Sequence, residues 1–477
     1  MDVRGRVLTA IKWTAAARFL GQIIAWVITI YVIRILSPAD YGLMAMAIVV
    51  NGFLYLINDV GLDAVLIQKR ELKEHEIRRV FGVVIAINLL FAVLVFAAAP
   101  LLADFFNEPL LVNMVRVLSL QFLFLAFETL PQAKLEREID FKDRSIVDFV
   151  TLLFGSVTTL VLALYGFGVW SLVYGHLANI ATRTIGLNII APCLCWPNFS
   201  VRGMGKMLSF GGFVTIDRSL WFVFAESDKF IGGKILGKEL LGVYAVANHL
   251  ASLPINKIAG LINSVTFPAF SRLQTEPKKI GDYLLKGINI MSIVAFPVFL
   301  GIACTSYELV SILLGEKWID AALPLLILGL VMPLRLLSTL LPPVLWGVGR
   351  PEVSASNFLV AAMVMPIAFI VGAQYGVFGL ALSWLLVYPV VFAVQLLRTL
   401  KVIQLSFGEV LKAISNAGFA ALGMFGSVLL MKDYVYGESG ELLHLLQLII
   451  LGASVYTLIL ISIDRQVIKN TLQLVRS

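Results

Sequence analysis

Charged residues are scarce in this chain. Asp, Glu, Lys and Arg supply 14% of the 477 residues, whereas about 25% is usual for soluble domains. Hydrophobic residues supply 59%, and the mean hydropathy is +0.92. A soluble protein of this length could not bury so much apolar surface in its cores, so the excess must face lipid. The composition therefore predicts an integral membrane protein.

Histidine and cysteine are scarcer still, and their spacing excludes several kinds of chemistry. The four histidines form no HExxH motif, and Cys193, Cys195 and Cys304 form neither a zinc pattern nor a redox CxxC pair. The segment Gly232–Lys238 has the spacing of a Walker A loop, but Glu239 stands where a Ser or Thr would ligate magnesium. We expect free thiols, no metal, no cofactor, no catalytic residue and no ATP hydrolysis, so the chain is not expected to be an enzyme.

Long hydrophilic connections are missing as well. The outer connections between apolar segments are short, and only Thr305–Ala321 has any length, so none could hold a catalytic domain. The net charge of +7 does not indicate nucleic-acid binding, because membrane proteins carry surplus Lys and Arg on their cytoplasmic loops.

About fourteen apolar segments are long enough to cross a bilayer, which takes about 20 helical residues. The first follows a basic N-terminus, is longer than a signal-peptide core and lacks a small-residue cleavage pattern, so we expect a retained helix. The expected spans are residues 13–36, 41–66, 80–102, 112–133, 146–166, 168–190, 207–235, 240–267, 284–304, 322–346, 353–374, 378–398, 408–431 and 442–463. The predicted fold is an all-α polytopic membrane protein.

The distribution of Lys and Arg predicts the orientation of these spans. Of 37 basic residues, about 25 fall at the termini and in the even-numbered connections, regions that the positive-inside rule places in the cytoplasm. The basic residues in the odd-numbered connections are Lys234, Lys238, Lys317 and Lys432. Both termini are therefore expected in the cytoplasm.

A repeat with an offset of 200 residues relates two halves of the chain. Ile35–Ala47 and Ile235–Ala247 share an Ile-Leu pair, a glycine (Gly42 and Gly242) and two alanines. Both copies start on the same side of the membrane, so the repeat is parallel, a plan that places the binding site of many transporters between the repeats. The predicted domains are two six-helix lobes, residues 1–200 and 201–400, and a C-terminal helix pair, residues 401–477.

Ionisable residues inside the predicted spans indicate a functional interior, because a charge in a bilayer must line a wet cavity or have a partner. Arg218 and Lys229, eleven residues apart in the seventh span, lie close to one helix face. A basic cavity would suit a diphosphate, since Arg offers paired donors to phosphate oxygens. The predicted substrate-binding residues are Arg18, Gln22, Arg183, Arg218, Lys229, Lys257 and Arg335. The carboxylates predicted to bind a coupling ion are Asp59, Asp63, Asp217, Glu226 and Asp228. The same charges could instead pair as structural salt bridges.

Five segments carry a resemblance to a known family. Ile35–Ala47, Asp59–Gln68, Glu226–Lys229, Leu236–Tyr244 and Phe267–Gln274 resemble bacterial polysaccharide flippases of the multidrug/oligosaccharidyl-lipid/polysaccharide exporter superfamily, in particular its colanic-acid and exopolysaccharide branch. The resemblance implies alternating-access translocation of an undecaprenyl-pyrophosphate-linked oligosaccharide across the bacterial inner membrane, from the cytoplasmic to the periplasmic leaflet. The implied partners are this substrate, membrane lipids and other polysaccharide-assembly proteins, and a two-lobed transporter is expected to act as a monomer.

Three other functions remain open from the sequence. A drug or cation antiporter of the same superfamily would favour an acidic cavity, whereas the basic residues in the spans outnumber the acidic ones. A membrane polysaccharide polymerase or glycosyltransferase would need longer loops than this chain has. In an envelope-assembly scaffold, the intramembrane charges would act only as staples between helices.

Overall fold

The computed structural model describes residues 21–58, 74–138, 141–193, 195–200, 205–272, 277–435 and 441–463. These residues form α-helices and one 3-10 helix, and no β-strand occurs among them. The all-α prediction is therefore confirmed. The chain divides into two compact units, Met1–Gly242 and Val243–Ser477, which are described separately.

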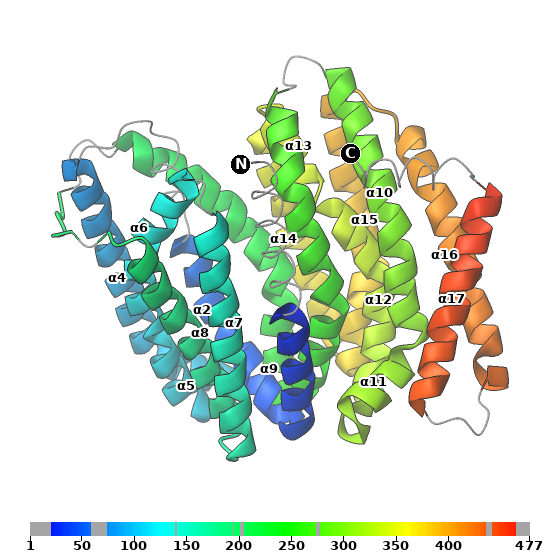
Figure 1. The fold of residues 1–477 in the computed structure, drawn as a ribbon, viewed down its shortest axis with the longest axis horizontal. Helices are drawn as coiled ribbons and strands as arrows, with labels where there is room; N and C mark the ends of the chain where they lie inside the picture. The colour runs from blue at the N-terminus through cyan, green and yellow to red at the C-terminus, as the bar shows by residue number, and fades with distance from the viewer. Residues whose placement is uncertain are drawn as a thin grey trace, which may run out of the picture. The chain divides into compact units, whose positions relative to one another are not determined.

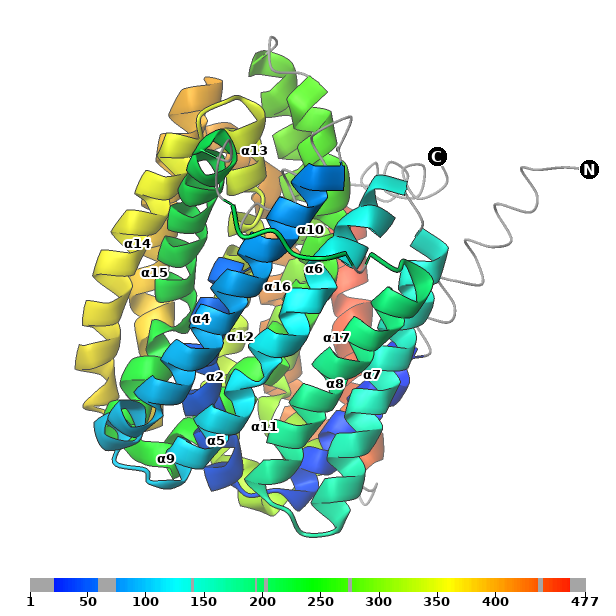
Figure 2. The same cartoon turned by 90° about the vertical axis from the view of Figure 1, so that its left-hand side faces the viewer.

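The first unit is a group of long helices (Figures 1 and 2). Its described elements are the helix Gly21–Ile35, α2 (Pro38–Asn58), α4 (Glu74–Phe106), α5 (Leu110–Ser119), α6 (Gln121–Glu138), α7 (Phe141–Leu164), α8 (Val169–Ile190) and the part of α9 (Gly205–Arg272) that ends at Gly242. Helices α4, α6, α8 and α7 lie in a row of neighbours in Figure 2.

The second unit begins with the remainder of α9. Its other elements are α10 (Pro277–Cys304), α11 (Ser306–Leu314), the 3-10 helix Glu316–Ala321, α12 (Ala322–Ser338), α13 (Leu341–Gly347), α14 (Pro351–Ala373), α15 (Gly376–Ile403), α16 (Phe407–Val435) and α17 (Glu441–Ile463). The division of the chain into domains at residues 200 and 400 stays a prediction.

The helices coincide with the spans expected from hydropathy. Nine helices in the described part of the chain are long and apolar enough to cross a membrane, and Gly21–Ile35 and Pro38–Leu54 form a further pair bent by 117°. The seventh and eighth expected spans both lie in α9, which is interrupted at Gly237. Gly237 has φ +77°, a backbone conformation that glycine adopts without a steric penalty, so the chain can turn back there.

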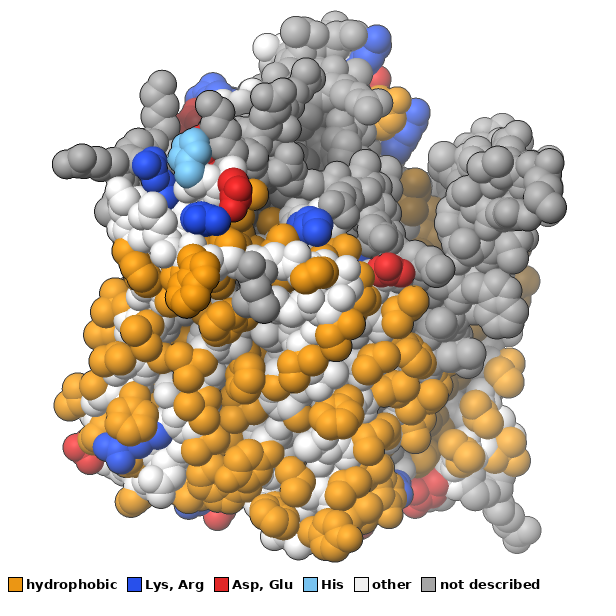
Figure 3. All heavy atoms as spheres, turned by 60° about the vertical axis from the view of Figure 1, so that its left-hand side comes forward, with side chains coloured by type: hydrophobic (Ala, Val, Ile, Leu, Met, Phe, Trp, Pro, Cys, Tyr) orange, Lys and Arg blue, Asp and Glu red, His pale blue; other side chains and the backbone are white. Residues whose placement is uncertain are grey.

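The surface of the first unit is apolar over the middle of its helices. On the face shown in Figure 3, hydrophobic side chains form a broad band and charged side chains gather above and below it. On α4, for example, Leu89, Val93 and Phe96 are each more than half exposed. In water such a band would be unfavourable, whereas in a bilayer it contacts acyl chains.

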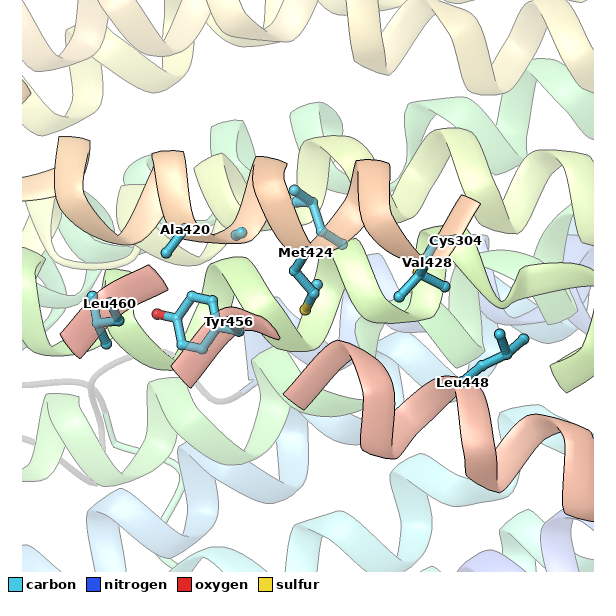
Figure 4. Packing of buried hydrophobic residues seen from close by; sticks show 9 residues of the cluster. Cys304, Ala420, Met424, Val428, Leu448, Tyr456 and Leu460 are labelled. Carbon is cyan, nitrogen blue, oxygen red and sulfur yellow. The ribbon is translucent and has the colours of Figure 1, made fainter. Parts of the chain in front are cut away.

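The last two helices pack against α10 through a buried apolar cluster (Figure 4). Ala420, Met424 and Val428 recur every four residues along one face of α16, toward Leu448 and Tyr456 of α17. The Tyr456 hydroxyl donates a hydrogen bond of 2.8 Å to the backbone oxygen of Ile293 in α10. The small side chain of Ala420 allows close helix approach, as is common in membrane interiors.

An ion pair holds one end of the same helix pair. Glu308 of α11 is buried, and its Oε1 lies 2.8 Å from Nζ of Lys432 in α16 and 4.0 Å from Nε2 of His444 in α17. One carboxylate thus joins three helices. Lys432 is one of the few basic residues in an odd-numbered connection, and the carboxylate explains its presence.

Candidate functional site

Helices α6 and α8 place their polar residues in matching positions. The pairs Gln121–His176 and Glu128–Arg183 are each 55 residues apart in sequence, and each helix advances by seven residues, about 10 Å, between the two pairs. The two helices run in the same direction, so residues spaced by seven stay on the facing sides. Seven residues further on, Leu135 and Ile190 pack in an apolar cluster. The polar positions therefore lie within one contact surface between the helices.

The first of these pairs extends into a chain of amide and imidazole contacts. Gln121 Nε2 donates to Asn51 Oδ1 at 3.2 Å, and Gln121 Oε1 lies 3.0 Å from His176 Nε2. Asn51 Nδ2 in turn donates to the backbone oxygen of Ala47 at 2.8 Å. Since Asn51 and Gln121 are buried, these hydrogen bonds satisfy amides that would otherwise be costly to bury.

Arg183, a predicted substrate-binding residue, has carboxylates around its guanidinium. Its Nε lies 3.2 Å from Oε1 of Glu128 and 4.0 Å from Oδ1 of Asp148, and its Nη2 donates to Oε1 of Gln132 at 3.3 Å. Glu128 is 5% exposed, so its negative charge sits in a poorly solvated place. A diphosphate approaching Arg183 would have to compete with two carboxylates. The structure thus favours a structural role for Arg183.

The charged segment of α9 also contains an internal pair. Nζ of Lys229 lies 2.5 Å from Oε2 of Glu226, one turn earlier. Asp228 is fully buried and its Oδ1 accepts a hydrogen bond of 2.7 Å from the Lys229 backbone N–H. Asp217 is buried as well, and Arg218 beside it is partly buried. The predicted site residues from Asp217 to Lys229 therefore all lie on α9. Within this group, the carboxylate of Glu226 already balances the charge of Lys229.

Arg335 in the second unit has a different environment. Its guanidinium carbon lies 4.1 Å from the centre of the Trp384 ring, and its Nη1 lies 3.9 Å from the Met332 sulfur. Among the residues that the structure describes, no carboxylate lies within ion-pair distance of Arg335. The positive charge is stabilised by the ring face, and a guanidinium that stacks on a ring keeps its N–H donors in the plane of the group.

The aromatic residue below Arg335 is held in place by its own contacts. Trp384 is fully buried and donates from Nε1 to the Tyr244 hydroxyl at 2.9 Å. The rings of Phe369 and Tyr388 lie 5.1 Å and 5.5 Å from it, centre to centre. Because its indole N–H is hydrogen-bonded and its ring is packed between aromatic neighbours, Trp384 forms a rigid support for the Arg335 guanidinium.

Several predicted site residues are not placed by the structure. Arg18, Asp59 and Asp63 lie outside the described residues, and Lys257 lies in α9 at a position where the side chain is not described. Gln22 is half-buried near the start of the helix Gly21–Ile35.

The sequence prediction also left out residues that the structure brings together. Glu128, Gln121 and His176 received no role, although the seven-residue spacing of Gln121 and Glu128, repeated in His176 and Arg183, was visible in the sequence. Within the described residues, no group of His, Cys, Asp and Glu has the arrangement of a metal site.

Two curated relatives cover most of the chain. The lipopolysaccharide biosynthesis protein WzxC of Escherichia coli (strain K12) is 26% identical over 81% of this chain and 79% of its own length. The succinoglycan biosynthesis transport protein ExoT of Rhizobium meliloti (strain 1021) is 24% identical over 93% of this chain and 90% of its own length.

Two solved structures share the fold. The lipid II flippase MurJ in an inward closed conformation has a TM-score of 0.78 at 14% identity, over 96% of this chain and 99% of that one. An inward-facing multidrug resistance MATE transporter has a TM-score of 0.62 at 16% identity, over 82% and 99%.

The family comparison covers more than half of the sequence. The pattern of the family described as "Polysaccharide biosynthesis protein" matches residues 31–323. This range extends from the first helix to the start of α12 and includes all five segments on which the resemblance rested. The chain belongs to the polysaccharide biosynthesis protein family.

Proposed function

We propose that this protein is a flippase that moves a lipid-linked oligosaccharide with an anionic diphosphate from the cytoplasmic to the periplasmic leaflet of a bacterial inner membrane. Family membership, the names of the relatives and the MurJ-like fold support this function. The substrate is moved without chemical change, by alternating access, and one chain suffices. Both termini lie in the cytoplasm, as the distribution of Lys and Arg indicates.

The observation that carries the proposal is the position of Arg335 on the face of Trp384. A guanidinium in an apolar span is costly unless it has a partner, and no described carboxylate pairs with this one. A diphosphate would supply the missing negative charge and would accept two parallel hydrogen bonds from the guanidinium. Arg335 is therefore the proposed diphosphate anchor in the second unit.

The roles proposed for the other predicted residues follow from their surroundings. Arg183 and Lys229 have carboxylates beside them, so they stabilise helix packing or exchange partners during transport. The buried carboxylates Asp217 and Asp228 are the proposed binding groups for a coupling cation, because a cation stabilises a carboxylate that is poorly solvated.

A cation antiporter is the second candidate function. Buried Asp217 and Asp228 would suit a cationic substrate, and the MATE fold is similar. However, the similarity to MurJ extends over 96% of the chain, whereas the similarity to the MATE structure extends over 82%. The larger share of the chain that matches MurJ therefore favours the flippase function over the antiporter.

Reconstitution into proteoliposomes separates these functions. The protein would be tested with a labelled polyprenyl-diphosphate oligosaccharide and, in parallel, with a fluorescent organic cation. Movement of the lipid-linked sugar between leaflets supports the flippase, and movement of the cation alone supports the antiporter. Mass analysis of the recovered lipid checks that no sugar was added or removed; a lengthened product would instead indicate a polymerase.

A further inference from the structure

Arg116 of α5 is a second arginine that lies on an aromatic ring without a carboxylate beside it. Its guanidinium carbon lies 4.8 Å from the centre of the Phe96 ring in α4, and these two helices pack against each other (Figure 2). Its Nε is buried and has no hydrogen-bond partner among the described residues. In the part of the chain that the structure describes, no carboxylate lies within ion-pair distance of this guanidinium. A cation within a predicted span therefore has only a ring to stabilise it there.

The carboxylates closest to Arg116 in the preceding sequence do not supply its missing charge. Glu108, eight residues earlier, is engaged by Lys238, whose Nζ lies 3.0 Å from its Oε2. Asp104 is exposed near the end of α4 and is eight residues from Phe96, about 12 Å along the helix axis. Arg116 thus differs from Lys238, which has its own anion.

The surroundings of Arg116 are apolar and open to the outside of the first unit. Leu89, Val93 and Phe96 follow one another at helical spacing along α4 and are each more than half exposed. On α5, Asn113 is exposed one turn before Arg116, and residues three apart share a helix face. A guanidinium and an amide therefore lie at one end of a strip of exposed apolar side chains.

The depth of Arg116 matches the border between headgroups and acyl chains. Helix α4 has 33 residues and is about 50 Å long, about 20 Å more than the hydrocarbon core of a bilayer. About 10 Å at each end can therefore lie among the headgroups. Arg116 is six residues, about 9 Å, from the start of α5 at Leu110, and side chains in helices lean toward the N-terminus. Its guanidinium can reach the level of the lipid phosphates.

We propose that Arg116, Asn113 and Phe96 form a binding site for one anionic phospholipid. The phosphodiester lies at the Arg116 guanidinium, and an acyl chain follows the exposed strip from Phe96 to Leu89. The distribution of Lys and Arg places this site in the outer leaflet. It is separate from the proposed diphosphate anchor at Arg335, and it does not require that the protein be a flippase.

The chemistry of these side chains fits a single phosphodiester. A phosphodiester has one negative charge, which one guanidinium balances, and its two free oxygens can accept N–H groups from the same arginine. The Asn113 amide can donate to a phosphate or glycerol oxygen. A diphosphate carries more negative charge, and the cations of the neighbouring α9 segment, Lys234 and Lys238, already bind oxygens. A zwitterionic lipid supplies its own cation, so an anionic phospholipid gains most from Arg116.

Native mass spectrometry of the full chain in detergent tests the site. Phosphatidylglycerol, or phosphatidylcholine with the same acyl chains, would be titrated into the protein and the bound lipids counted. The wild-type protein should bind the first phosphatidylglycerol more tightly than phosphatidylcholine. Arg116→Gln should weaken that binding about tenfold, as expected for the loss of one charge-assisted contact. Arg350→Gln is the control, because Arg350 is exposed and pairs with Glu352; it should bind like the wild type.

The same titration identifies the lipid. Equal phosphatidylglycerol affinity in Arg116→Gln and the wild type would refute the site. A polyprenyl diphosphate forms the third arm of the experiment. If Arg116→Gln loses affinity for the polyprenyl diphosphate and keeps its affinity for phosphatidylglycerol, Arg116 binds the transported type of lipid, and the proposal is wrong as well.

A measurement on the wild-type protein keeps the proposal testable if Arg116→Gln does not fold. Phosphatidylglycerol with a photoactivatable headgroup would be cross-linked to the protein in vesicles and the modified peptides sequenced. Adducts on α5 between Leu110 and Leu120 support the site, whereas adducts confined to other helices refute it. None of these measurements requires flipping, so a failure of the proposed transport function and a failure of this lipid site would be seen independently.

Discussion

The guanidinium of Arg335 stacks on the face of Trp384, 4.1 Å above the ring centre, and has no carboxylate partner among the described residues. Arg183, in contrast, has Glu128 and Asp148 beside it. Arg183 thus has carboxylate and amide partners, whereas Arg335 lies beside an indole ring and a thioether. We propose that Arg335 is the one that binds an anion. This difference leads to opposite expectations for their substitution.

Arg335→Ala should lower substrate affinity while leaving the amount of protein in the membrane near normal. Losing a paired hydrogen bond between charged groups costs about 1.5–3 kcal/mol, which corresponds to about a 10- to 150-fold weaker Kd. This change in Kd would be measured as binding of the labelled lipid-linked oligosaccharide to detergent-solubilised protein. Arg335→Lys, which keeps the charge but not the planar fork, should lose less. Arg350→Ala, at an exposed pair with Glu352, is the control. Wild-type affinity in Arg335→Ala would refute the anchor.

Glu128→Gln should destabilise the protein, because Arg183 would keep its charge without its nearest carboxylate. An unsatisfied buried partner costs about 1–3 kcal/mol, and since Arg183 is a quarter exposed and Asp148 remains nearby, we expect the lower part of that range. Thermal unfolding in detergent measures the change. The double variant Glu128→Gln/Arg183→Met should recover most of the stability. If Arg183→Met alone abolishes binding in a stable protein, the structural role is wrong.

Lys432→Met should loosen the last helix pair. It leaves the buried carboxylate of Glu308 without its closest cation, at a cost of about 1–3 kcal/mol. A lower thermal unfolding temperature in detergent would show this. Lys412→Met, on the exposed part of α16, is the control. Equal stability of the two variants would mean that the ion pair contributes nothing.

Cys195 tests the topology. It lies in the connection between α8 and α9, which we expect on the cytoplasmic side, and an impermeant maleimide should label it only from that side. Burial raises the pKa of the Cys195 thiol, and Glu74 raises it further against the opposing effect of Arg78. Because the thiolate is the reactive form, labelling should be slower than that of a free cysteine at neutral pH and should speed up as the pH rises. Labelling from the outside of intact cells would overturn the orientation.

The helices were predictable from the sequence because hydropathy has one dominant cause, the lipid around each span. The spans 353–374 and 378–398, for example, coincide with α14 and α15 within a few residues. The repeat was also visible, and its Gly42 and Gly242 are in contact in the structure. The repeat could be recognised because the same residue types recur at the same positions of both copies.

Partners across helices were less predictable. The seven-residue spacing of Gln121 and Glu128, repeated in His176 and Arg183, is visible in the sequence, but the sequence does not show that α6 and α8 become neighbours, on which the pairing of Arg183 with Glu128 depends. Likewise, Arg335 and Trp384 lie on α12 and α15, and their stacking follows from the packing of those helices. A charge inside a span could be recognised, but its role depended on contacts far away in sequence.

The most direct test of the central claim is the dependence of flipping on the charge of the lipid headgroup. Proteoliposomes would receive either a polyprenyl-diphosphate oligosaccharide or the same oligosaccharide on a neutral polyprenyl carrier, and the rate of movement between leaflets would be measured with and without a proton or sodium gradient. The account predicts rapid, protein-dependent movement of the diphosphate lipid, slow movement of the neutral one, and loss of this preference in Arg335→Ala. Equal rates for both lipids, or no protein-dependent movement of either, would contradict it.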